Sequence, residues 1–159
     1  MAISVPTESY IEGEVHFSEE GYEEMVMEAC EYLENTDCGL RVRGFGEDWP
    51  VDVGYDLSTV MEELPDLIES IRATGSGEID FYAQGMERTL SFSTNGEEVE
   101  ITCASTTSWR PDPRTEKMGT SELDRMLVSL AVNFGRSVEF ISPPLSEREP
   151  FASWKNGVV

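Results

Sequence analysis

Residues 77–105 read GEIDFYAQGMERTLSFSTNGEEVEITCAS, and this stretch decides the fold. Apolar and polar side chains alternate along most of it, which is the period of a β-strand with one buried face. Asn95-Gly96 in its second half is a strong signal for a two-residue hairpin turn. We therefore predict a three-stranded antiparallel meander over residues 78–104.

The turn also predicts a register. A two-residue Asn95-Gly96 loop places Phe92 opposite Val99 and Leu90 opposite Ile101, so that apolar side chains meet on one face. The preceding hairpin leaves two possibilities. A Gln84-Gly85 loop pairs Phe81 with Arg88, whereas a four-residue loop over 84–87 pairs Phe81 with Leu90 and Ile79 with Phe92. We favour the longer loop because it keeps the arginine off the core face.

Helical and extended segments flank this meander. Apolar residues with helical spacing predict three helices: one from Ser18 to about residue 34, one from Asp56 or Ser58 to Gly75, and one from Thr120 or Ser121 to Gly135. The other predicted strands cover 9–17, 40–44, 51–55 and 138–141, residues 107–118 form a loop, and Phe151 and Trp154 pack back on the body. The order β-α-β-β-α-β-β-β-α-β predicts an α+β fold, mainly antiparallel, with helices on one face of the sheet.

Length and composition narrow the class of protein. We expect 159 residues to form a single domain, and 39% hydrophobic residues argue against disorder. No run approaches the roughly 18 apolar residues that a membrane span needs, and residues 1–14 lack the features of a secretory signal. We expect a cytoplasmic protein that binds neither membrane nor nucleic acid, because both of those partners require cationic neutralisation.

No motif for catalysis, a cofactor or a metal is present. The single histidine, His16, precludes a His-rich metal site, and Cys30, Cys38 and Cys103 form no C-x-x-C pair. Cys103 lies on the apolar phase of a strand, so we expect it in the core. Asp48, Asp52 and Asp56 recur every four residues but do not fit a calcium-binding loop. We therefore predict no catalytic, cofactor or metal site and no tightly bound transition metal.

Negative charge is concentrated in the first hundred residues. The net charge is −21, and residues 1–100 alone hold 25 acidic residues against four arginines. Within Ser18–Asn35 there are seven glutamates and no lysine or arginine. On a helix, five of them follow one another at spacings of three or four residues, where like charges repel. These residues form the predicted glutamate stripe: Glu20, Glu24, Glu28, Glu31 and Glu34.

Two features are candidates for binding. The glutamate stripe is either a solvated helix face, a docking surface for a basic protein, or the partner of Arg41 and Arg43 within the chain. Trp109 lies in a proline-rich loop and is either packed beneath it or an exposed aromatic anchor, a residue type enriched in interface hot spots. If the stripe is a docking surface, changing Glu20, Glu24 and Glu28 to glutamine preserves the fold and weakens binding at low salt.

With this stripe, an α+β body and only two lysines, Lys117 and Lys155, the chain resembles the small acidic immunity proteins of bacterial polymorphic toxins. That resemblance implies a non-enzymatic inhibitor that neutralises a basic, nuclease-like toxin by occlusion. Two other classes stay open. One is a carboxylate-based hydrolase, which a pocket with a carboxyl group of raised pKa would favour. The other is a structural or regulatory subunit, which a large apolar surface patch would favour. The sequence does not specify an oligomeric state.

Overall fold

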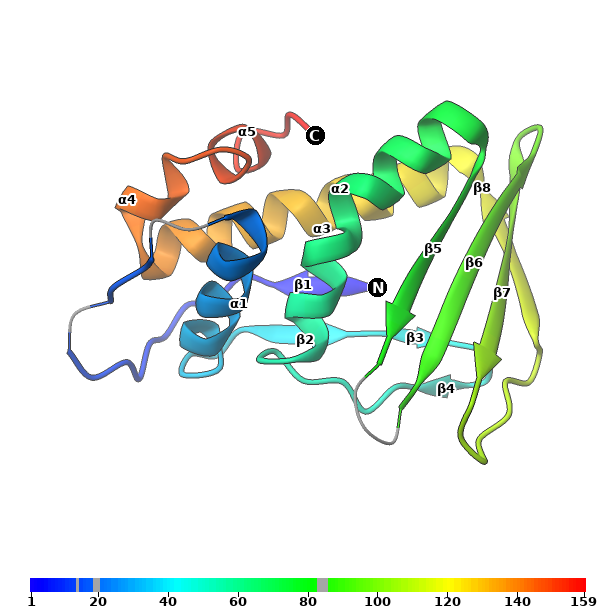
Figure 1. Ribbon diagram of the computed structural model, residues 1–159, viewed down its shortest axis with the longest axis horizontal. Helices are drawn as coiled ribbons and strands as arrows, with labels where there is room; N and C mark the ends of the chain where they lie inside the picture. The colour runs from blue at the N-terminus through cyan, green and yellow to red at the C-terminus, as the bar shows by residue number, and fades with distance from the viewer. Residues whose placement is uncertain (14, 19–20, 83–85) are drawn as a thin grey trace.

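A four-stranded antiparallel sheet forms one end of the protein (Figure 1). The structure is a computed structural model that describes residues 1–13, 15–18, 21–82 and 86–159. The strands lie in the order β5 (Ser76–Phe81), β6 (Arg88–Asn95), β7 (Glu98–Ser105) and β8 (Thr115–Gly119). The predicted meander is confirmed, and β8 extends it by one strand. Residues 115–118, predicted as loop, are ordered by pairing with β7.

The predicted registers are each shifted by two residues. Phe92 lies opposite Ile101 and Leu90 opposite Cys103, because the hairpin turns at Gly96-Glu97 and Asn95 still pairs with Glu98. Gly96 has φ +68, a left-handed conformation that glycine tolerates. A shift of two preserves the face of every side chain, so the apolar face is as predicted. In the first hairpin Phe81 pairs with Arg88, the alternative that we had not favoured.

Two short ribbons and five helices complete the described part of the chain. The ribbons pair β1 (Ala2–Ser4) with β2 (Gly39–Arg41), and β3 (Arg43–Gly44) with β4 (Glu47–Asp48). The helices are α1 (Tyr22–Leu33), α2 (Asp56–Thr74), α3 (Thr120–Ile141), α4 (Pro143–Ser146) and α5 (Phe151–Trp154). The chain therefore has an α+β fold, as the sequence predicts.

Helices α2 and α3 cover the inner face of the sheet, whereas α1, α4 and α5 lie away from it (Figure 1). Ile79, Leu90, Phe92 and Cys103 point inward and are buried, whereas alternate residues such as Asp80 and Glu100 point outward and are exposed. The buried apolar side chains form one cluster that extends from Ile3 to Trp154. Phe151 and Trp154 are part of it, which confirms that the C-terminal segment packs back on the body.

Several predicted boundaries are wrong. Helix α1 begins at Tyr22 and not at Ser18, whose N–H donates to the Glu28 carboxylate. The described residues of 9–17 form only an isolated bridge between Ser9 and Thr36. Residues 51–55 form no strand, because the Asp52 carboxylate accepts hydrogen bonds from the N–H groups of Tyr55 and Asp56 and caps α2. Helix α3 continues through Gly135 to Ile141, so residues 138–141 are helical.

The end of α2 is as predicted. Gly75 stops the helix in a left-handed conformation with φ +77, and its N–H donates to the Ile71 carbonyl. The chain then reverses into β5, so that α2 and β5 lie side by side in opposite directions (Figure 1). This reversal brings acidic residues of α2 next to acidic residues of an edge strand.

Candidate acidic docking groove

The glutamates of the predicted stripe that the structure describes point away from the core. Glu31 and Glu34 are exposed, Glu24 and Glu28 are half-buried, and Glu20 lies outside the described residues. Glu28 is partly engaged, since its carboxylate accepts the Ser18 N–H at 2.9 Å. The opposite face of α1 is the buried one, as predicted; it carries Met25, Val26, Ala29 and Leu33.

Acidic residues of three elements line one groove. Glu23 comes from the first turn of α1, Glu62, Glu63 and Asp66 from α2, and Glu78 from β5. Leu67 and Ser70 complete the lining, and the groove has a volume of about 450 Å³. We call these five acidic residues the acidic groove. The predicted glutamate stripe does not include any of these five residues, because Glu23 lies beside the stripe on α1 and the other carboxylates belong to segments that become neighbours only on folding.

Hydrogen bonding fixes one wall of the acidic groove. The Glu63 carboxylate accepts the backbone N–H of Asp80 at 3.0 Å, so it occupies a donor on the free edge of β5. Satisfying an edge-strand donor with a carboxylate also discourages pairing with another strand. Glu63 therefore holds α2 against β5 and keeps negative charge at the groove.

Two carboxyl groups of the acidic groove, those of Glu62 and Glu63, have raised pKa values. Burial, followed by the nearby charges of Glu23 and Glu24, raises the pKa of Glu62 above its usual value. Burial also raises the pKa of Glu63, with smaller contributions from Asp80 and Glu62, although the hydrogen bond from Asp80 opposes the shift. The charged forms of Glu62 and Glu63 therefore lower the stability of the fold at neutral pH.

No cation within the described residues neutralises the groove. The ion pairs among the described residues all lie outside the groove. They join Arg41 to Asp48, Arg72 to Asp124, Arg88 to Glu47, Lys117 to Glu98, and Lys155 to Glu139 and Glu147. Arg41 therefore pairs with Asp48 and not with Glu24, Glu28, Glu31 or Glu34, the described part of the glutamate stripe. None of these pairs includes an acidic residue of α1 or of the groove.

We expect the Glu62→Gln/Glu63→Gln variant to unfold at a higher temperature than the native chain at pH 7. Removing the repulsion adds about 0.5 kcal/mol to the free energy of unfolding. The native chain holds these protons more tightly when folded, so its own stability rises as the pH falls from 7 through the raised pKa values. The difference in unfolding temperature between the variant and the native chain should therefore vanish near pH 4, as measured by thermal unfolding. Glu97→Gln/Glu100→Gln is the control, and an equal gain from it contradicts this prediction.

Trp109 is half-buried and packs against other side chains. The Arg88 guanidinium lies 3.5 Å from the centre of the Trp109 ring and 4.4 Å from that of Trp49, and it donates to the Glu47 carboxylate at 2.9 Å. This packing explains how the register tolerates Arg88 on the core face. It also gives Trp109 a packing role that agrees with the first of the two interpretations from sequence.

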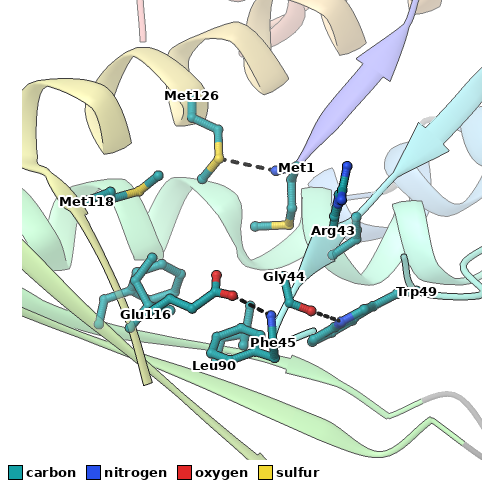
Figure 2. A pocket seen from close by; sticks show the side chains of 12 residues that line it. Met1, Arg43, Gly44, Phe45, Trp49, Leu90, Glu116, Met118 and Met126 are labelled. Atoms are coloured by element: carbon teal, nitrogen blue, oxygen red, sulfur yellow. Dashed lines mark hydrogen bonds between the residues drawn. The ribbon is translucent and has the colours of Figure 1, made fainter. Parts of the chain in front are cut away.

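A smaller cavity of about 100 Å³ lies between the sheet, α3 and the β3–β4 turn (Figure 2). Its lining is mostly apolar and includes Met1, Met118, Met126, Phe45 and Trp49. Two of its polar side chains have partners, since Glu116 accepts the Phe45 N–H at 2.6 Å and Trp49 donates to the Gly44 carbonyl. These bonds hold the turn against the sheet.

The described residues offer few other sites. No group of three or more His, Cys, Asp or Glu side chains in that part of the chain is placed to hold a metal ion. Cys30 and Cys103 are buried and Cys38 is half-buried, which confirms Cys103 as a core residue. Burial raises the pKa of all three thiols, which disfavours the reactive thiolate. Nowhere in the described ranges does a helix combine the length and apolar character of a bilayer span.

Comparisons with known proteins give no match. No protein-family model matches the chain, and no curated protein or solved structure is similar to it. The candidate site therefore rests on the geometry and charge of this chain alone.

Proposed function

We propose that the protein is an acidic binding module that inhibits a basic protein partner by covering its cationic surface. The observation that carries this proposal is the acidic groove, whose five carboxylates make no ion pair within the described residues. Keeping so many like charges together costs stability, and a cationic partner that neutralises them would recover that cost.

The partner that fits this surface is a basic, nuclease-like toxin, and the protein would then act as its immunity protein in the bacterial cytoplasm. A nuclease binds its substrate in a positively charged groove that neutralises phosphates. Carboxylates projecting from α1, α2 and β5 offer the same charge on a fixed scaffold. Strong negative charge also accelerates the encounter with a cationic protein.

A carboxylate-based hydrolase is the second candidate, and the raised pKa values of Glu62 and Glu63 are the observation that favours it. Partial burial is the main cause of both shifts, with a smaller contribution from Glu23 and Glu24 at Glu62, so no catalytic role is needed to explain them. The described lining of the groove contains no histidine, cysteine or cation beside these acids. Binding accounts for the arrangement with fewer assumptions than catalysis.

The test measures association between the purified chain and the product of the adjacent gene by surface plasmon resonance at 50 and 300 mM salt. In the groove variant, Glu23→Gln/Glu62→Gln/Glu63→Gln, we expect the association rate at 50 mM salt to fall at least about tenfold and its salt dependence to flatten. Thermal unfolding checks that the variant stays folded.

A matched variant neutralises three acids away from the groove: Glu97→Gln/Glu100→Gln/Glu122→Gln. All three are exposed and form none of the ion pairs in the described structure. It should associate at a rate within about threefold of the native chain. Equal losses in both variants would show that total charge matters and not the groove. Absence of binding by the native chain would refute the proposed function.

A further inference from the structure

A pair of exposed tyrosines lies at one end of α2 and β5, the two elements that supply four of the five acids of the groove. Tyr55 precedes α2 and Tyr82 follows β5, so the antiparallel arrangement of these elements brings the two together (Figure 1). Their ring centroids lie 5.6 Å apart at an interplanar angle of 81°. The rings are 48% and 52% exposed, which is unusual for aromatic side chains that pack against each other.

Acidic residues flank this pair along the chain. Asp56 follows Tyr55 directly but is only 2% exposed, and Glu62 lies about two turns further along α2. Partial burial, Tyr82, Asp56 and Glu62 together raise the pKa of Tyr55. Asp80 precedes Tyr82 by two residues and points to the same exposed side of β5. An apolar platform at the end of a negatively charged groove is suited to a cation that also has a flat, apolar surface.

Elsewhere in the chain, an arginine already stacks on a pair of aromatic rings. Trp49 and Trp109 lie 6.0 Å apart at 73°, Arg88 stacks on both, and Glu47 receives its hydrogen bond. The Tyr55–Tyr82 pair has a similar edge-to-face geometry and neighbouring carboxylates. Among the described residues, however, no arginine or lysine stacks on it.

We propose that the Tyr55–Tyr82 pair is the anchor point that receives an arginine side chain of the basic partner. The guanidinium stacks on an exposed tyrosine ring and donates hydrogen bonds to a carboxylate at that end of the groove. This inference rests on the proposed function and specifies its partner further. Arginine fits better than lysine, because its planar guanidinium is less strongly hydrated and can stack and donate at the same time.

The experiment uses capped hexa-arginine and hexa-lysine peptides as probes, with affinities measured by calorimetry at 100 mM salt. We expect the native chain to bind hexa-arginine at least about fivefold more tightly than hexa-lysine. Tyr55→Leu/Tyr82→Leu should reduce this ratio to about one and leave hexa-lysine affinity within about twofold. Tyr55→Phe/Tyr82→Phe keeps the rings and should keep the ratio. Tyr10→Leu, an exposed tyrosine outside the groove, is the control.

The outcomes separate this inference from the proposed function. If Tyr55→Leu/Tyr82→Leu keeps the preference for arginine, or if the native chain shows none, the tyrosine anchor is refuted while the groove can still bind basic proteins. The groove variant tests the proposed function with the same two peptides. If it binds both peptides as tightly as the native chain, then the acidic groove is not a cation-binding surface and the proposed function falls.

Discussion

Replacing Gly135 with alanine lowers the free energy of unfolding by about 2 kcal/mol, even though alanine favours a helix more than glycine does. Gly135 lies inside α3 and is buried. A Cβ atom there would lie 2.8 Å from the backbone nitrogen of Lys155 and 3.2 Å from the carbonyl oxygen of Phe151. Both are backbone atoms, so they can move away only if α5 shifts and disturbs the packing of Phe151 and Trp154.

Urea unfolding measures this change. Ser129→Ala serves as the control, because it is an exposed position on the same helix whose hydroxyl bonds only the Arg125 carbonyl. It should change the stability by less than about 0.5 kcal/mol. If α5 did not crowd the added Cβ atom, Gly135→Ala would instead stabilise the protein by up to about 1 kcal/mol. That result would contradict the close packing of α5 on α3.

Gly135 also shows where prediction from sequence fails. Glycine after an apolar helical stripe is a typical helix stop, and Gly75 follows that rule with a left-handed φ of +77. Gly135 retains helical geometry and serves the approach of α5, which is more than fifteen residues further along the chain. Local sequence cannot distinguish the two, because the difference depends on a tertiary contact.

The meander shows what the alternation of apolar and polar residues can predict. Period two predicts which face each side chain takes, and this was confirmed for Ile79, Leu90, Phe92 and Cys103. It does not fix the pairing, since a shift of two residues gives the same faces. Arg88 was the misleading residue: its charge argued against a register that places it opposite Phe81, but Trp49, Trp109 and Glu47 accommodate it there.

The candidate site was only partly accessible from sequence. Charge density on α1 predicted an acidic helix face, and Glu24, Glu28, Glu31 and Glu34 do lie off the buried face of α1, but the groove takes Glu23 from this helix and none of these four. The acids of α2 and β5 carried no such signal, because they are interspersed with core residues at ordinary frequency. Their convergence results from the reversal at Gly75, which places Glu63 against Asp80.

Replacing Arg88 with alanine should lower the free energy of unfolding by about 3 kcal/mol, the largest effect we expect from a single charged residue. Arg88 is 5% exposed, and its side chain fills the space between Trp49 and Trp109. Alanine would leave a cavity there and remove both stacking contacts. It would also loosen the attachment of β4, since Glu47 would lose its ion pair.

Arg88→Met separates packing from charge. Methionine fills much of the same volume, and it removes two buried donors, Nε and Nη1, that have no hydrogen-bond partner. Replacing a buried ion with a well-packed apolar side chain is often nearly neutral, and Glu47 is exposed enough to be solvated when unpaired. We therefore expect Arg88→Met to lower the free energy of unfolding by about 1 kcal/mol or less.

Urea unfolding of both variants measures the difference in stability. Arg72→Ala is the control, because it removes an exposed ion pair worth up to about 1 kcal/mol. If Arg88→Met is as unstable as Arg88→Ala, then the charge of Arg88, through Glu47 and the two tryptophan rings, holds this end of the sheet together, and the volume that it fills is secondary.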